Sequence, residues 1–585
     1  MLEATLRLFK GVYVEGKFGS STDAEKIMQI EKGFYLNDQI PYTSEVRDAI
    51  MKVVMTPEVN ATFFKSWEYI RNTLQERLFF HQIFHYITTY GLGLDGYIPD
   101  SEVDNVDVKI PIIHIQALTL EDIIEGIKAL GANVALSEQT LEDILTIIVY
   151  LKLEEPIKVS NRELTTRIND FYDIVPSAPV EFLRHWIYTL TGETVLIKSP
   201  ELIEKLKNAE NIDALIPLAP MDLASIFYRF KPLFLAMKQG SKNKRFFNQL
   251  RRKAVKLHKA MPEDLIATVM SKCLKDKLWQ TEAFVKQLQY TSNFRKIRLL
   301  NAITFRLEAR TNAIVYKIRN SKTWTTTTKV NIHRSLHELK LTLILSIINS
   351  LNIKGNTYYI PKFIEYACPT SEKDFMGNIP CGSCVSIKED MIVGISWENV
   401  KGRQTDLDLS AVSLDGKVGW DTSHTSSSKS LVYSGDITNA PTPVNENFLI
   451  SKDRKVSDLF TVNYYNHSSE HPVPAKIFVA RHTGNEEEVL MSAPLDITGD
   501  YHLLGLHTPD GFYFQTGNFG NICSSRESEQ TRLAREFFTE SNRLKLTMRD
   551  LLQTAGAKVV SENEEGAIDL SPEYLKKDTL ITILT

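Results

Sequence analysis

The chain has few cysteines and no uninterrupted apolar run long enough to span a bilayer, which argues against a disulfide-stabilised protein and against a membrane-spanning one. Its net charge is only −4. Five cysteines spread over 585 residues do not form the framework of a disulfide-stabilised secreted domain. The start, MLEATLRLFKGVYVEGKFG, lacks the basic region and apolar core of a signal peptide. We therefore expect a cytoplasmic protein with reduced cysteines and no membrane partner.

The motifs of common catalytic sites are also missing. The sequence has no P-loop, no G-x-G-x-x-G after a strand and no G-x-S-x-G elbow. PCGSC (380–384) is a C-x-x-C pair without the second pair that a zinc site needs, so strand packing explains it better. His81 and His85 are spaced i, i+4, but Gln82 stands where a zinc protease has Glu, which favours core histidines. We expect a binding protein and not an enzyme.

The periodicity of apolar residues divides the chain into two parts. From about residue 45 to 350, amphipathic helices follow one another; LTLEDIIEGIKALGA, for example, starts at a capping Thr and stops at Gly131. After residue 377, short runs such as MIVGISW, LDLSAVSL and LFTVNYY lie between Gly, Asn, Asp and Ser clusters, which is typical of a β-sandwich. The stretch from 526 onward returns to helix.

These patterns predict a multidomain α + β protein. We expect an N-terminal segment (1–44), an all-α helical-repeat array (45–350), a linker (351–376), an all-β sandwich (377–525) and a short C-terminal helical tail (526–585). The array, HEAT-like in pattern, is similar in its predicted architecture to the ring of helical hairpins in TROVE-type RNA-binding proteins. That similarity is an analogy of architecture and charge, without a shared motif.

Positive charge is concentrated in one part of the helical array. Residues 229–340 contain 26 Lys or Arg against six Asp or Glu, and 238–259 contain nine basic residues and no acidic one. Phe294, Phe305, Tyr316 and Trp324 lie between the downstream basic residues, as suits a surface that meets phosphates and stacks on bases. We predict that this basic belt binds RNA or another polyanion through the following residues: Lys242, Lys244, Arg245, Arg251, Arg252, Lys253, Lys256, Arg295, Lys296, Arg298, Arg306, Arg310, Lys317 and Arg319.

A basic face has other uses, and the sequence leaves them open. The face can be merely solvated, or it can meet the acidic remainder of the same chain. It can also dock acidic surfaces of partner subunits, which would make the chain a structural or assembly protein.

Two carboxylates stand close together in the stretch TDLDLSAVSLDGKVGW (405–420). Asp406 and Asp408 are two residues apart in a predicted strand, so both side chains project from the same face. Carboxylates this close repel each other unless one is protonated or a cation lies between them, and Ca²⁺ is the usual hard cation with oxygen ligands. The alternative is a strand end near solvent, where the pair needs no ligand.

The order of the motifs in the predicted sandwich carries a resemblance. IVGISWENVKGRQTDLDLSAVSLDGKV is followed by LVYSGDIT, LFTVNYYNHSS and LLGLHTPDGFYFQTGNFGN. Over about 377–525 this series resembles the TerD-like domain of tellurium-resistance and stress-response proteins. The resemblance implies a β-sandwich that binds Ca²⁺ through acidic loops, a stress-response role, and protein partners.

Asp406, Asp408 and Ser410 match the D-x-D-x-S strand of that family, and Gly435 and Asp436 match its Gly-Asp turn. The chain departs from the family pattern at three places: Ile437 replaces an Asn, Gln404 replaces an acidic residue, and Glu398 replaces the Asp after Trp397.

The family's acidic run is here NAPTPVNENF, in which Glu446 is the one carboxylate. Because calcium affinity follows ligand charge, the resemblance implies a weaker Ca²⁺ site. Its expected ligands are Asp406, Asp408, Asp436, Asn445 and Glu446.

Overall fold

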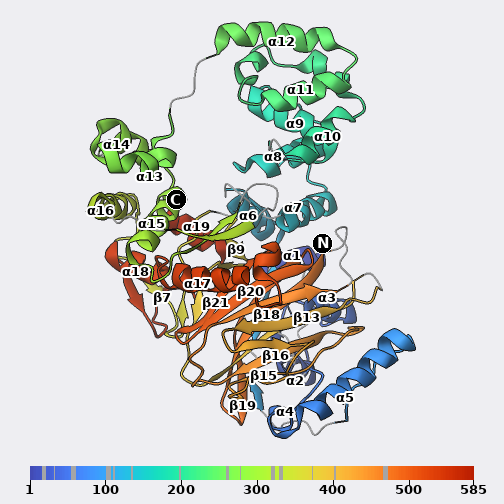
Figure 1. Ribbon diagram of the computed structural model, residues 1–585. Helices are drawn as coiled ribbons and strands as arrows, with labels where there is room; N and C mark the ends of the chain where they lie inside the picture. The colour runs from blue at the N-terminus through green and yellow to red at the C-terminus, as the bar shows by residue number, and fades with distance from the viewer. Residues whose placement is uncertain are drawn as a thin grey trace. The chain divides into compact units, whose positions relative to one another are not determined.

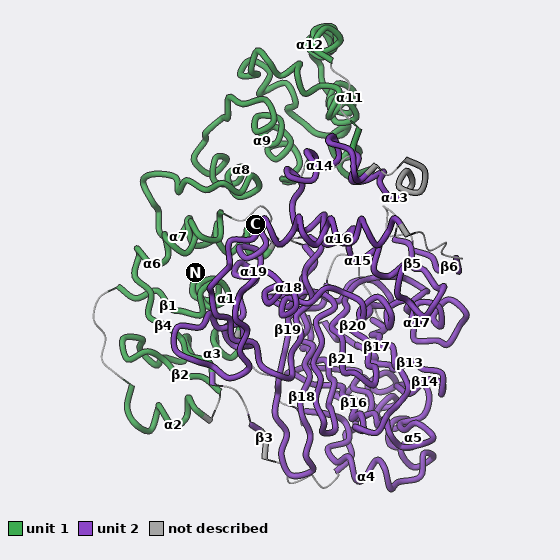
Figure 2. Tube along the Cα trace, turned by 90° about the vertical axis from the view of Figure 1, so that its left-hand side faces the viewer, with its two compact units in different colours: residues 1–55, 113–264 green, residues 56–112, 265–585 purple. Residues whose placement is uncertain are grey.

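A computed structural model gives the architecture of the chain (Figure 1). It describes residues 1–15, 21–31, 33–54, 59, 61–100, 107–109, 112–132, 136, 138–194, 196, 199–258, 263–276, 278–317, 323–328, 334–371, 373–400, 403–465 and 472–585. The chain forms two compact units, and each is discontinuous in sequence (Figure 2). Unit 1 comprises residues 1–55 and 113–264, and unit 2 comprises residues 56–112 and 265–585.

Unit 1 is mainly helical. Its helices are α1 (Leu2–Phe9), α2 (Asp23–Glu31), α3 (Ser44–Val54), α6 (Leu120–Gly131), α7 (Glu138–Leu151), α8 (Arg162–Phe171), α9 (Pro179–Thr191), α10 (Pro200–Lys207), α11 (Lys231–Gly240) and α12 (Lys244–Leu257), with 3₁₀ turns η2 (Ile212–Leu218) and η3 (Leu223–Ile226). A parallel sheet of order β1 (Gly11–Tyr13), β4 (Ile113–Leu118), β2 (Phe34–Leu36) lies at its start. Helix α6 confirms its predicted bounds, because Thr119 and Asp122 form a reciprocal capping box at its first turn.

Unit 2 contains two packed sheets. The first has the order β14 (Gly416–Gly419), β13 (Leu407–Ser413), β17 (Asp458–Tyr464), β20 (Tyr501–Thr508), β21 (Gly511–Gly517), β11 (Cys384–Val385), β8 (Ile364–Glu365). The second has the order β15 (Leu431–Tyr433), β16 (Val444–Ile450), β12 (Asp390–Trp397), β18 (Val473–His482), β19 (Glu486–Ile497), β3 (Asp107–Lys109). Alternating apolar residues of both sheets form one core; the rings of Phe448 on β16 and Phe460 on β17, for example, are 5.3 Å apart.

Helices cover the outer faces of these sheets. Residues 59 and 61–78, with helix α4 (Trp67–Asn72) and the start of α5 (Gln75–Tyr86), pack on the sheet that contains β16, where Phe63 and Phe64 are buried against Val432 and Leu449. Helix α17 (Glu529–Arg543) and turn η5 (Gly520–Cys523) cover the other sheet.

The rest of unit 2 is assembled from helices and small sheets. Its helices are the 3₁₀ turn η4 (Leu278–Gln280), α13 (Leu265–Asp276), α14 (Glu282–Gln289), α15 (Asn293–Glu308), α16 (Arg334–Ile348), α18 (Met548–Thr554) and α19 (Lys577–Leu584). The small sheets are β5 (Ala313–Lys317) with β6 (Thr323–Thr327), β9 (Phe375–Met376) with β10 (Ile379–Pro380), and β7 (Thr357–Tyr359) between β22 (Lys558–Val560) and β23 (Ile568–Asp569). None of the described helices is both long and apolar enough to cross a membrane.

The predicted coarse layout is confirmed: helices lie mainly in the N-terminal half and strands mainly in the C-terminal half. The stretch 45–350 is mainly, but not wholly, helical, because it also contains β3 to β6. The expected linker 351–376 includes β7, β8 and β9, and the divisions between the two units follow residues 55, 112 and 264.

Candidate metal centre

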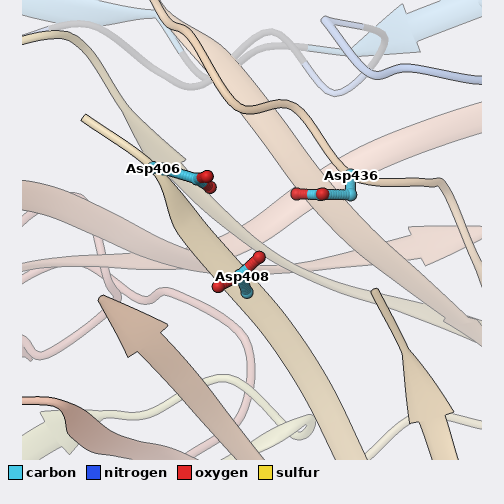
Figure 3. A group of neighbouring side chains, drawn as sticks. All are labelled: Asp406, Asp408 and Asp436. Atoms are coloured by element: carbon cyan, nitrogen blue, oxygen red, sulfur yellow. The ribbon is translucent and has the colours of Figure 1, made fainter. Parts of the chain in front are cut away.

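Asp406, Asp408 and Asp436 converge within unit 2 (Figure 3). Asp406 directly precedes β13, Asp408 is on β13, and Asp436 is in the loop after β15. One carboxylate oxygen from each lies within 4.8 Å of the others. The three side chains come from two segments that the sequence predicted to contribute to one site.

The three carboxylates are shielded from solvent. Asp406, Asp408 and Asp436 are exposed by 2%, 3% and 1%, so the alternative of a solvated strand end is wrong. Burial raises the pKa of all three, and the neighbouring carboxylates raise the pKa of Asp406 and Asp408 further. Among the described residues, no Lys, Arg or His forms an ion pair with any of them. Without a cation, the cluster therefore favours bound protons.

Hydrogen bonds satisfy only part of the cluster. The Oδ2 atom of Asp408 accepts from the Asn463 side chain at 2.9 Å, and the Oδ2 atom of Asp436 accepts from the Tyr86 hydroxyl at 2.8 Å. The Tyr90 hydroxyl donates to Oδ2 of Asp406. The Oδ1 atoms of Asp406 and Asp436 are buried and accept from no donor in the part of the chain that the structure describes, and the Asp436 carboxyl also lies within hydrogen-bonding reach of the Glu446 carboxyl. Such oxygens are the ones that a cation would satisfy.

A helix from far upstream in the sequence holds the loop that carries Asp436. Gln82 of α5 bonds both backbone groups of Asp436: its amide donates to the carbonyl at 2.8 Å, and its oxygen accepts from the N–H at 3.1 Å. His85 Nε2 accepts from the N–H of Thr438 at 3.0 Å, which places the imidazole proton on Nδ1, directed to the carbonyl of Tyr97 at 2.8 Å. His85 is fully buried, as predicted for a core histidine.

The two remaining predicted ligands, Glu446 and Asn445, project from opposite faces of β16. Glu446 is fully buried, and its carboxylate accepts from the N–H of Leu409 at 2.7 Å, the Tyr433 hydroxyl at 2.6 Å and the N–H of Ile437 at 3.1 Å. Asn445 is the preceding residue on β16, so its side chain points to the opposite face of the sheet. Glu446 therefore ties β13, the loop and β16 together beside the three aspartates.

The cysteines of the C-x-x-C pair are explained by packing. Cys381 and Cys384 are both buried and free, and Cys384 lies on β11. Burial raises the pKa of each thiol to about 12, so both are protonated at neutral pH.

The predicted polyanion-binding residues divide between the two units, because unit 1 ends at residue 264. In unit 1, the residues on and just before α12 are all exposed: Lys242, Lys244, Arg245, Arg251, Arg252, Lys253 and Lys256. Helix α12 buries Phe247, Leu250 and Ala254 on its other side, so its basic residues fill a solvent-facing surface. The buried residues recur every three or four positions, which places them on one face of the helix and the basic residues on the other.

The predicted residues in unit 2 have mixed settings. Arg295, Arg298, Arg310 and Lys317 are exposed, and Arg306 is half-buried, with its guanidinium donating to the carbonyl of Ala302. Arg319 lies outside the described residues.

Lys296 is a correction to the predicted set. It is only 2% exposed, its Nζ donates to the carbonyl of Ser346 at 3.4 Å, and burial lowers its pKa. It lies on the side of α15 that packs on the core with Ile297 and Leu300, and so it cannot meet a polyanion.

Sequence comparison adds no further residues to the site. No protein-family model matches the chain, and a comparison with curated proteins gives no match.

Proposed function

We propose that unit 2 is a non-enzymatic calcium-binding module whose cation is held by Asp406, Asp408 and Asp436. The observation that carries the proposal is the convergence of three buried carboxylates, two of which have an oxygen without a partner. Oxygen-only, anionic donor sets suit hard cations such as Ca²⁺. The resemblance of 377–525 to the calcium-binding TerD-like domain supports the same reading, and with it a stress-response role in the cytoplasm.

The raised pKa of Asp408 determines whether the cluster stabilises or destabilises the folded protein at a given pH. Burial and mutual repulsion raise the pKa of Asp408 above the ordinary value of about 3.9, so the folded state binds its proton more tightly than the unfolded state. Protonated Asp408 therefore makes its full stabilising contribution to the free energy of unfolding at a pH below about 3.9. That contribution is lost as the pH rises through the raised pKa of the folded state. At neutral pH in a chelator, the cluster is therefore destabilising, and Ca²⁺ reverses this.

Substitution of Asp408 by Asn tests the proposal through thermal unfolding. In chelator at neutral pH, we expect Asp408→Asn to unfold at a higher temperature than the wild type, because a buried Asn carries no charge and needs no proton to be neutral. With Ca²⁺ we expect the order to reverse, since Ca²⁺ at about 100 times its Kd adds about 2.7 kcal/mol to the free energy of unfolding of a protein that binds it. Glu562→Gln, at an exposed carboxylate, should respond to Ca²⁺ like the wild type. An equal calcium response in Asp408→Asn and wild type would refute the site.

A second candidate function belongs to unit 1. We propose that α12 binds RNA or another polyanion, because its exposed face carries six Lys or Arg and no acidic residue. Phosphate contacts by such a face release counterions, so the affinity should fall steeply with salt. The similarity in predicted architecture to TROVE-type RNA-binding helical rings is consistent with this proposal.

The triple variant Arg251→Gln, Arg252→Gln, Lys253→Gln tests α12 by electrophoretic shift with single-stranded RNA. Loss of three phosphate contacts should lower the slope of log affinity against log salt by about 2. A matched control changes three exposed cations elsewhere in unit 1, namely Lys152, Lys158 and Arg162, to Gln. If wild type does not shift RNA but self-associates at low salt, the basic face instead docks acidic surfaces of partner subunits, and the assembly function replaces the polyanion function.

A further inference from the structure

The aspartate cluster is closed by one continuous helical segment from the N-terminal half of the chain. Helix α5 runs directly into the π-helical turn η1 (Ile87–Gly91). Tyr86 is the last residue of α5 and Tyr90 lies in η1, so the two are four residues apart and on one side of the helix. Single π-helical turns occur frequently at functional sites.

Each of the two tyrosines contacts a different carboxylate. The Tyr86 hydroxyl donates to Oδ2 of Asp436, and the Tyr90 hydroxyl donates to Oδ2 of Asp406. In both aspartates the other oxygen, Oδ1, is the buried atom that has no partner among the described residues. Asp406 and Asp436 point toward each other across the cluster (Figure 3). Each hydroxyl thus occupies Oδ2 of its carboxylate and leaves Oδ1 for a ligand.

We infer that Tyr86 and Tyr90 are positioning residues of the calcium site, and that each holds one carboxylate in place for the cation through its phenol hydroxyl. This inference rests on the proposed function of the aspartate cluster. Groups that hydrogen-bond a metal ligand fix its orientation and strengthen binding, although they do not touch the metal. Residues 75–91 thereby become part of the calcium site, more than 300 positions before the aspartates in the sequence.

The contacts of α5 give the tyrosines a fixed geometry. Gln82, one turn before Tyr86, and His85, directly before it, bond the backbone of Asp436 and Thr438, so the helix cannot turn without breaking these bonds. Hydrogen bonds from Gln82, His85 and the Tyr86 hydroxyl to the same loop therefore hold the tyrosines over the carboxylates.

Removal of each hydroxyl tests the inference by calorimetric titration of the full chain with CaCl₂. We expect Tyr86→Phe and Tyr90→Phe each to bind Ca²⁺ about 10-fold more weakly than wild type. Tyr97→Phe is the matched control, because its hydroxyl contacts His81 and no carboxylate, and it should bind as wild type does. Unfolding in chelator checks that all three variants are folded.

A second readout separates positioning from a general loss of stability. Terbium at saturation replaces Ca²⁺ and is excited directly, because a Tyr→Phe change removes a sensitising phenol ring whatever the carboxylates do. Loss of the hydroxyl lets the carboxylate turn and admits water to the ion, so the terbium lifetime should shorten in Tyr86→Phe and Tyr90→Phe but not in Tyr97→Phe. Calcium binding by both Phe variants that equals or exceeds that of wild type, with an unchanged terbium lifetime, would overturn the inference and leave the aspartate site intact. Absence of any calcium binding by wild type would overturn both.

Discussion

Gly435 controls how the loop with Asp436 reaches the cluster. Its φ of +91° is a conformation that residues with a side chain rarely adopt, and a Cβ there would lie 2.7 Å from Phe63 and 2.9 Å from Phe64. We expect Gly435→Ala to lower the free energy of unfolding by about 3 kcal/mol, from backbone strain and overpacking together. Gly484 has a similar φ of +87° with nothing within 4 Å of its Cβ, so Gly484→Ala should lower it by about 1 kcal/mol. Denaturant unfolding measures both, and equal losses would show that packing on the two phenylalanines is unimportant.

Single residues of the site differ in how well sequence reasoning finds them. Asp406 and Asp408 follow from strand alternation, because two carboxylates on one face of an apolar strand need an explanation. Asp436 comes from the Gly-Asp turn that the motif order identified. Tyr86 and Tyr90 could not be predicted, since a contact between residues 350 or 316 positions apart leaves no local pattern.

Lys296 shows the converse limit of sequence reasoning. The charge of Lys296 predicted an exposed side chain, but its position on α15 buries the aliphatic part of the side chain in the core. Its Nζ donates to the carbonyl of Ser346 at 3.4 Å. A count of charges along a segment does not say which face of the helix each residue occupies.

At the scale of elements, α5 is held to the sandwich by histidines that titrate. Burial lowers the pKa of His85, and it lowers the pKa of His424, which lies against the ring of Phe79 on α5, to about 4. The pKa values of both histidines in the folded state are below the ordinary value of about 6.5. The neutral histidines therefore stabilise the folded protein fully above about pH 6.5, and this stabilisation is lost as the pH falls through their lowered pKa values.

Acid should therefore loosen residues 75–91. We expect faster deuterium exchange in peptides from this segment at about pH 5 than at about pH 7, after correction for the intrinsic rates. Acid has the opposite effect on the three aspartates, whose raised pKa values make protonation stabilising. The contribution of His85 is therefore isolated by comparing wild type with His85→Gln at the same pH. This variant should show a smaller pH effect, and His258→Gln, at an exposed histidine, should behave as wild type. An identical pH effect in His85→Gln would assign the loosening to another group.

The sequence of α5 did not reveal which of its faces is buried. Phe80, Ile83 and Phe84 are 63%, 44% and 53% exposed, while Gln82 and His85 are buried. From Phe80 onward the usual pattern of an amphipathic helix is reversed, because the polar side chains satisfy buried backbone groups of the Asp436 loop. Helix α6, by contrast, follows its capping residues and its apolar period.

At the scale of the whole molecule, the change in periodicity after residue 350 did not mark the division between the units. Helices α13 to α16 read like the helices before them, yet they contribute Val269, Phe284, Leu300 and Leu343 to the same core as the sandwich. Periodicity determines the type of an element and the face that it buries, but not the core that it joins. Residues 56–112 likewise lie between the two sequence segments of unit 1, although they belong to unit 2.

This division predicts how ligands act on the unfolding of the full chain. All three aspartates and both tyrosines lie in unit 2, and α12 lies in unit 1. If the two proposed functions hold, Ca²⁺ and RNA each stabilise a different unit. We expect two transitions in differential scanning calorimetry: Ca²⁺ at about 100 times its Kd should raise one by the equivalent of about 2.7 kcal/mol, and RNA should raise the other. Asp408→Asn should remove only the first shift, and the α12 triple variant only the second. A single transition that both ligands move equally would mean that the two units unfold as one cooperative body, because each ligand would then stabilise the whole chain.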